Sequence, residues 1–258
     1  MTTCQPVVAI DGPAGSGKST VAQQAAQLAG LQFISSGAMY RAVALCALRA
    51  GTLATDRDRL EQIAATLPIR FTTAADGTVR TIVAEEDVTD ALRDPAVAQV
   101  AAIIAALPAV RAHLVAKQQA YGRDGGIVME GRDIQTVVFP NADIKLFVTA
   151  SPEERALRRW KELQAQETPA DYRTVLAEVI ERDARDESRE ASPLRAAPDA
   201  ITIVTDGQTV EQVVHYLLRI IDTWRADPSL HGQALARVAG CPAAGAPRHA
   251  EPGDGGIR

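Results

Sequence analysis

Gly12-Pro13-Ala14-Gly15-Ser16-Gly17-Lys18-Ser19 follows the apolar run Val7-Val8-Ala9-Ile10. The stretch fits the pattern G-x-x-x-x-G-K-[ST], a loop that wraps nucleotide phosphates. Its glycines let backbone N–H groups converge on an anion, while Lys18 supplies a positive charge and Ser19 a hydroxyl for Mg²⁺. The residues from Thr20 to Ala29 favour a helix, whose N-terminus would direct its partial positive charge at the same phosphates. The stretch therefore predicts a strand, a loop and a helix that together bind a nucleoside triphosphate.

Short apolar runs alternate with helical patterns along most of the chain. Such alternation is typical of an α/β fold with a parallel sheet and right-handed crossovers. Besides the run before the loop, four segments are predicted strands: Leu31 to Ile34, Ile127 to Met129, Ile144 to Val148 and Ile201 to Val204. We therefore expect a five-stranded parallel sheet flanked by helices, with nucleotide bound at the carboxyl ends of the strands.

Residues 52–95 interrupt this alternation. A helical stripe is followed by two alternating segments, residues 69–73 and 79–83, on either side of the turn signal Asp76-Gly77. This pattern predicts a small inserted subdomain that contains a β-hairpin.

The chain is expected to form one kinase-type domain over residues 1–225, followed by a tail over residues 226–258. That tail holds eight Ala, six Gly and four Pro. Because such a composition buries little apolar surface, we expect the tail to be disordered. The tail could bind a partner, or it could be a variable extension without function, and the sequence favours neither.

The composition narrows the classes of partner and compartment. A net charge of −5 argues against a general nucleic-acid binder, and the three cysteines have no metal-ligand spacing. The first six residues lack a signal pattern, and the longest apolar run is too short to span a bilayer. We therefore expect a cytoplasmic protein, monomeric, with small-molecule partners and neither nucleic acid nor membrane.

Charged clusters elsewhere indicate a second substrate that carries phosphate. Arg132-Asp133 follows one predicted strand, and Ser36 with Tyr40 and Arg41 follows another. An arginine at a strand end can grip a phosphate through two N–H groups. Two helical segments carry further charged residues. The first holds Arg155, Arg158 and Arg159, and the second holds Arg182, Arg185, Asp186 and Arg189. For these segments a solvated helix face with i,i+4 ion pairs is the competing interpretation.

Taken together, these motifs resemble the bacterial cytidylate kinase family over residues 6–225. The absence of an Asn-Lys-x-Asp stretch disfavours a GTPase. The motifs that carry the resemblance are Ile10-Asp11-Gly12-Pro13, Ser36-Gly37-Ala38-Met39-Tyr40-Arg41, Glu86-Asp87-Val88-Thr89, Pro108-Ala109-Val110-Arg111, Gly131-Arg132-Asp133, Thr136-Val137-Val138-Phe139-Pro140, and Glu181-Arg182-Asp183 through Arg189. The resemblance implies a P-loop nucleoside monophosphate kinase fold and transfer of the γ-phosphoryl of ATP to CMP or dCMP with Mg²⁺.

The resemblance also implies a role for each matching residue. Gly12 to Thr20 would hold ATP, with Lys18 over the transferred group and Ser19 on the metal. The acceptor nucleotide would contact Ser36, Tyr40, Arg41, Arg111, Arg132, Asp133, Arg182, Asp186 and Arg189. Within that set, Arg111 and Asp133 would read the cytosine edge, and Arg182 and Asp186 would contact the sugar. The catalytic side chains would be Lys18, Arg132, Arg155, Arg158 and Arg159, the last three in a lid over residues 151–190. The insertion at 52–95 would be the nucleotide-monophosphate-binding subdomain.

The sequence departs from the family pattern at four positions. Ser35 and Glu130 stand where the family usually has Asp, and Gln135 stands in place of a glycine that would serve a special backbone angle. Ala102 aligns with a serine that helps to read cytosine. These departures keep two alternatives open: a kinase that accepts UMP as well as CMP, and a weakly active nucleotide-binding module.

Overall fold

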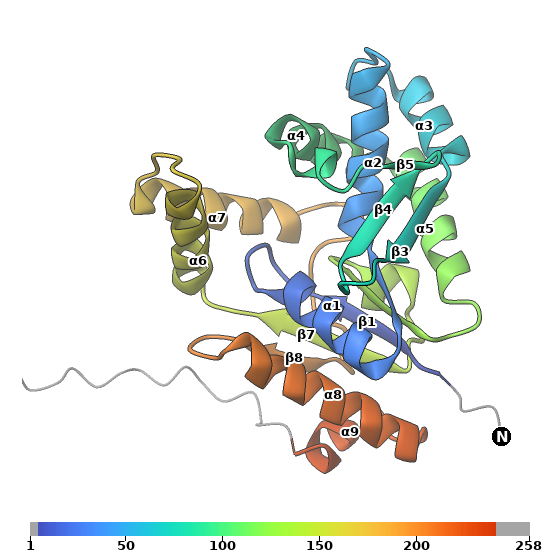
Figure 1. Ribbon diagram of the computed structural model, residues 1–258, viewed down its shortest axis with the longest axis vertical. Coiled ribbons are helices and arrows are strands. Elements are labelled where there is room, and N and C mark those ends of the chain that lie inside the picture. The colour runs from blue at the N-terminus through green and yellow to red at the C-terminus, as the bar shows by residue number, and fades with distance from the viewer. Residues whose placement is uncertain (1–4, 241–258) are drawn as a thin grey trace, which may run out of the picture.

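A five-stranded parallel sheet forms the centre of the protein. The computed structural model describes residues 5–240. The strands lie in the order β2-β6-β1-β7-β8 and all run in the same direction (Figure 1). Their bounds are β1 Val7–Asp11, β2 Gln32–Ser35, β6 Ile127–Gly131, β7 Ile144–Thr149 and β8 Ile201–Val204. This confirms the sheet predicted from the sequence and brings the carboxyl ends of β2, β6 and β1 side by side.

Helices cover both faces of the sheet, so the central strands β1 and β6 are almost wholly buried. On one face α1, α8 and α9 pack against Val8, Ile10 and Leu146, with Trp224 among the core side chains. On the other face α2 and α5 pack against Ala9 and residues of the neighbouring strands (Figure 1). The bounds of these helices are α1 Lys18–Ala29, α2 Ser36–Arg49, α5 Pro108–Tyr121, α8 Val210–Ala226 and α9 Gly232–Val238.

The inserted segment packs around α2 and α5 and shares one hydrophobic core with them. The predicted hairpin is present as antiparallel β3 and β4, and a short third strand, β5, extends it. The Tyr121 hydroxyl donates to the Ile69 carbonyl oxygen at 2.8 Å, which ties the hairpin to α5. The elements of the inserted segment are α3 Arg57–Thr66, β3 Ile69–Thr73, β4 Val79–Val83, β5 Glu86–Asp87, η1 Ala91–Arg93 and α4 Pro95–Ile104.

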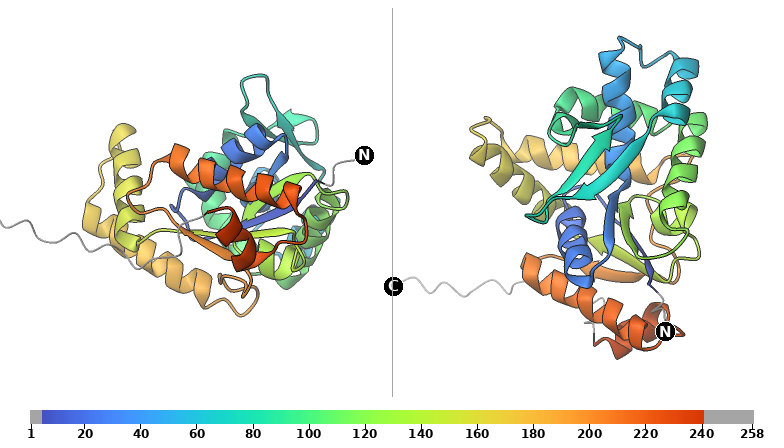
Figure 2. Two further views of the ribbon diagram at one scale, coloured as in Figure 1. Left: turned by 90° about the horizontal axis from the view of Figure 1, so that it is seen from below. Right: turned by 45° about the vertical axis from the view of Figure 1, so that its right-hand side comes forward.

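Helices α6 (Pro152–Ala165) and α7 (Tyr172–Glu187) form an arm that projects beside the sheet (Figure 2). The start of α6 follows from its sequence. Pro152 occupies the first turn, and the Ser151 side chain accepts from the Glu154 N–H. Between β6 and β7 lies a single π-helical turn, η2 (Ile134–Val138).

One helix in the described part of the chain is missing from the sequence prediction. We expected disorder from residue 226, but residues 226–240 are ordered and α9 packs onto α8 and β8. Leu235 is fully buried, and Ala236 and Ala239 are nearly so. The Ala- and Gly-rich composition hid these closely spaced apolar residues, which are enough for one short helix with a buried side. The rest of the predicted tail, residues 241–258, lies outside the described residues.

Within residues 5–240, no single helix is long and apolar enough to cross a membrane. Helices α4 and α5 meet that criterion only as a pair, and the pair is bent by 101°.

We predict that the segment after α8 stabilises the fold. A chain ending at residue 226 exposes the core surface that Leu235 covers, and so should lose about 2–4 kcal/mol of unfolding free energy. Urea unfolding of this chain, compared with a chain ending at residue 240, measures the loss. Coincident midpoints for the two chains would contradict the structural role of α9.

Candidate active site

The loop between β1 and α1 has the backbone geometry of an anion cradle. A Cβ on Gly12 would lie 1.9 Å from the Val148 carbonyl oxygen, so only glycine fits at the end of β1. Gly17 is the N-cap of α1 and has φ +82°, a conformation that glycine adopts without strain. Within residues 5–240, no side chain caps this N-terminus and its first turn carries no acidic residue. Its N–H groups are therefore available to a phosphate.

Lys18 lies inside this cradle and is buried. Its Nζ donates to the Pro13 carbonyl oxygen at 3.1 Å and lies 3.9 Å from a carboxylate oxygen of Glu130. Burial lowers the pKa of Lys18 to about 7, and the neighbouring Arg132 contributes to the same shift. The Glu130 carboxylate opposes the shift without cancelling it. The carboxylates around Lys18 therefore do not keep its ammonium group fully charged at neutral pH, and a bound anion would stabilise the charged form.

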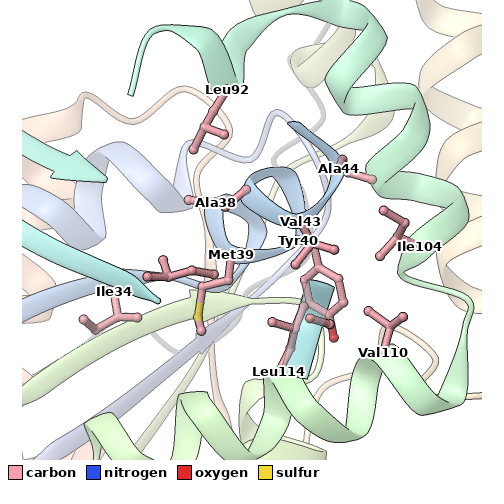
Figure 3. Close-up of a cluster of buried hydrophobic side chains, with 14 of the residues drawn as sticks. Ile34, Ala38, Met39, Tyr40, Val43, Ala44, Leu92, Ile104, Val110 and Leu114 are labelled. Carbon is pink, nitrogen blue, oxygen red and sulfur yellow. The ribbon is translucent and has the colours of Figure 1, made fainter. Parts of the chain in front are cut away.

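The next cluster comes from the start of α2, where β2 ends. The Ser35 side chain caps α2 by accepting from the Ala38 N–H. Figure 3 shows the Tyr40 ring directed at α5, where Val110 and Leu114 lie. The guanidinium carbon of Arg111 is 5.8 Å from the centre of that ring. Packing of the apolar side of α2 thus fixes its polar residues Ser36 and Arg41 at the carboxyl edge of the sheet.

A cavity of about 490 Å³ connects the cradle with the charged clusters. All nine residues that the sequence assigns to the acceptor nucleotide line it, together with Lys18 and Ser19. Its basic residues are Lys18, Arg41, Arg111, Arg132, Arg182, Arg185 and Arg189, and its acidic residues are Glu130, Asp133 and Asp186. This excess of cations, in a chain of net charge −5, marks the cavity as a site for anionic ligands.

Two ion-pair networks lie in the wall of the cavity. Asp186 on α7 is buried, accepts from Arg132 Nε at 3.0 Å and forms an ion pair with Arg189, whose Nη2 lies 2.6 Å from Asp186 Oδ1. Arg111 on α5 contacts Asp133 through Nη2, and the same nitrogen donates to Ser192 Oγ at 2.7 Å. Because α5, α7 and the loop after β6 meet here, the cavity is assembled from three distant parts of the chain.

The three arginines of α6 occupy different environments. Arg155 is buried, contacts Asp183 through both terminal nitrogens, and donates to the Ala14 carbonyl oxygen of the phosphate loop. Arg158 reaches the same loop through the Ser16 carbonyl oxygen at 3.4 Å. Arg159 pairs with Glu162 and is half exposed. The structure thus brings Arg155 and Arg158 to the loop and leaves Arg159 on the outer side of the helix.

Sequence reasoning missed the way in which Asp11 and Gln135 hold the site together. Asp11 accepts from the backbone N–H groups of Ile134 and Gln135, each at 2.9 Å. Gln135 does not adopt the left-handed backbone expected of a glycine position. Its side chain instead bridges the Leu146 carbonyl oxygen and the Ala197 N–H. A polar residue two positions after Asp133, between the apolar residues Ile134 and Val137, was the only sequence signal for this bridge.

Two of the four departures from the family pattern form one unit. The Ser35 hydroxyl donates to the Glu130 carboxylate at 2.6 Å, across neighbouring strands β2 and β6. Burial alone would raise the pKa of Glu130, but Lys18, the Ser35 hydroxyl and nearby arginines together lower it below its usual value. Glu130 is therefore ionised and faces Lys18.

The fold and the cavity define a P-loop phosphotransferase with a second anion site beside the loop. A sequence model of the cytidylate kinase family matches residues 8–223. A cytidylate kinase of Pelotomaculum thermopropionicum is 46% identical over 86% of this chain and 98% of its own length. One of Streptococcus suis is 47% identical over 81% of this chain and 93% of its own length. The chain belongs to the cytidylate kinase family.

Among solved structures, a gluconokinase from Sinorhizobium meliloti is 16% identical, with a TM-score of 0.40 over 93% of this chain and 96% of its own. A sugar kinase from Janibacter is 18% identical, with a TM-score of 0.40 over 86% of this chain and 97% of its own.

We predict that the chain takes up protons when it binds ATP in mildly alkaline solution. At about pH 8 most Lys18 is neutral, because its pKa is about 7. Phosphate oxygens favour the charged form, so binding should raise that pKa and take up close to one proton. Calorimetry in buffers of different ionisation enthalpy measures the uptake, with Lys18→Met as the variant that cannot titrate. A binding enthalpy that does not depend on the buffer would contradict the prediction.

Proposed function

We propose that this chain transfers the γ-phosphoryl group of ATP to CMP or dCMP, giving ADP and CDP or dCDP. The main support for this proposal is that the phosphate loop and a second group of cations face one cavity. Membership of the cytidylate kinase family supports the same reaction. Positioning and charge neutralisation account for most of the catalysis of phosphoryl transfer, and this cavity supplies both.

On the donor side, the α1 N-terminus and Lys18 bind the ATP phosphates. Ser19, which is exposed on the cavity wall, and the ionised Glu130 near Lys18 would supply oxygen ligands of the kind that Mg²⁺ prefers. When bound, Mg²⁺ neutralises charge on the phosphates. Arg158, which contacts the loop carbonyl of Ser16, is suited to join them when the α6–α7 arm closes. Arg155 instead donates to the Ala14 carbonyl oxygen of the loop and pairs with Asp183. Arg155 and Arg159 remain candidates for lid arginines that close over the phosphates.

On the acceptor side, Arg41 and Arg132 hold the monophosphate, assisted by the hydroxyl groups of Ser36 and Tyr40. Arg132 then lies between the two nucleotides, close enough to Lys18 to lower its pKa. Arg182 and Asp186 of α7 contact the sugar, with Arg189 beside them. Because α7 belongs to the arm, binding of the acceptor couples to the position of the arm and excludes water from the reacting phosphates.

The base is read by a donor and an acceptor placed side by side. The Arg111 guanidinium offers N–H groups to the ring N3 and O2 of cytosine, and the Asp133 carboxylate accepts from its amino group. Uracil presents an oxygen where cytosine has the amino group and an N–H at N3, so both contacts become unfavourable. Ala102 lines the same cavity on α4 and adds no hydrogen bond. Selectivity thus depends mainly on Arg111 and Asp133.

A panel of acceptors tests this function. Initial rates of ADP release with ATP and CMP, dCMP, UMP or AMP should show the highest kcat/KM for CMP or dCMP. Lys18→Ala, purified in the same way, should lose nearly all turnover because a main cation over the transferred group is gone. If UMP or AMP gave the highest kcat/KM, the assignment would fail. Rates that Lys18→Ala retains would point to a contaminating kinase.

A further inference from the structure

Ser192 adopts a backbone conformation that is unusual for a residue with a side chain. Its φ is +56°, in the left-handed region, where a Cβ is unfavourable. It lies in the segment from Ser188 to Ala197 that follows α7, which we name the return segment. Strain of this kind persists only where the surroundings enforce it, and it concentrates at functional sites.

The return segment is fixed at both sides of Ser192. Before it, α7 ends in the network around Asp186; after it, the Leu194 N–H donates to the Asp186 carbonyl oxygen at 2.9 Å. Further along, the Ala197 N–H donates to Gln135 Oε1 at 3.0 Å. Leu194, Ala197 and Gln135 are all buried. These anchors hold Ser192 in place against the cost of its backbone conformation.

What the strained residue contacts is Arg111. Ser192 Oγ accepts from Arg111 Nη2 at 2.7 Å, and Arg111 Nη1 donates to the Ala105 carbonyl oxygen at 3.3 Å. The guanidinium is therefore held from two sides in addition to its contact with Asp133. Arginine and carboxylate often pair through two parallel hydrogen bonds. Here Arg111 bonds only one oxygen of Asp133, Oδ2, within the described residues.

We propose that Ser192 is a specificity-determining residue that acts by positioning Arg111. By engaging Nη2, its hydroxyl keeps the guanidinium from turning into a two-point pair with Asp133. The Oδ1 oxygen of Asp133 is thereby kept for the amino group of cytosine, and the Arg111 N–H groups stay directed at the base. This inference rests on the proposed function, because it assumes that Arg111 and Asp133 read the base.

The proposal distinguishes the Ser192 hydroxyl from the Ser192 backbone. Ser192→Ala removes the hydroxyl and keeps the strained conformation, whereas Ser192→Gly removes the hydroxyl and relieves the strain. Ser192→Asn keeps a side-chain oxygen in a residue that tolerates the left-handed region. Ser188→Ala makes the same truncation at an exposed serine at the end of α7 and is the matched control.

The experiment measures kcat and KM for CMP and UMP at saturating ATP, with KM for ATP and the Tm of each variant. For Ser192→Ala and Ser192→Gly we expect KM for CMP to rise about tenfold, as for loss of one hydrogen bond to a charged group. The kcat, the KM for ATP and the kcat/KM for UMP should stay within about twofold, so CMP selectivity falls. Ser192→Asn should restore most of the selectivity, and Ser188→Ala should match the wild type.

Two outcomes would overturn the role of Ser192 while leaving the proposed function intact: Ser192→Gly retaining the wild-type CMP to UMP ratio, or equal losses for CMP and UMP in both hydroxyl-free variants. A wild-type enzyme that shows no preference for CMP over UMP would instead overturn the proposed function itself. The wild-type measurement therefore separates the two failures before any variant is compared.

Discussion

The buried carboxylate of Asp11 joins the two loops on which the site depends. Parallel strands β1 and β6 are neighbours, so the phosphate loop and the loop after Gly131 begin at the same edge of the sheet. Asp11 ends β1 and accepts from the backbone N–H groups of Ile134 and Gln135. Burial raises the pKa of Asp11 to about 7 although both hydrogen bonds lower it. The junction thus carries a solvation cost, and it fixes the loop after β1 relative to the loop after Gly131.

Around this junction the protein gathers positive charge that its own carboxylates do not balance. Glu130 and Asp186 each lie close to more than one cationic side chain. These carboxylates do not offset the burial of Lys18, whose pKa stays at about 7. Anionic nucleotides supply the missing charge. Since the cations come from α1, α2, α5, α7 and the loop after β6, a ligand with phosphates in both positions draws these elements together. Under the proposed function, ligand binding and assembly of the catalytic arrangement are the same process.

The sequence was sufficient wherever the signal is local. A glycine pattern after an apolar strand predicts the loop between β1 and α1, and arginines at strand ends predict a cationic cavity, because parallel strands end at a shared edge. It was insufficient where a residue acts across the fold. The Asp183 pair of Arg155, the Gln135 bridge and the Ser192 contact join segments separated by tens of positions, with no periodicity to mark them. The buried side of α9 was hidden by its composition.

Under the proposed function, one cavity holds both nucleotides with their phosphates in line. Isothermal titration with adenosine and cytidine joined by a pentaphosphate tests it most directly, compared with ATP and CMP titrated separately. Because the linked ligand fills both positions in a single binding event, it should bind at least ~100-fold more tightly than either nucleotide. An affinity no greater than that of ATP alone would show that the two anion sites do not act together, and would contradict the account.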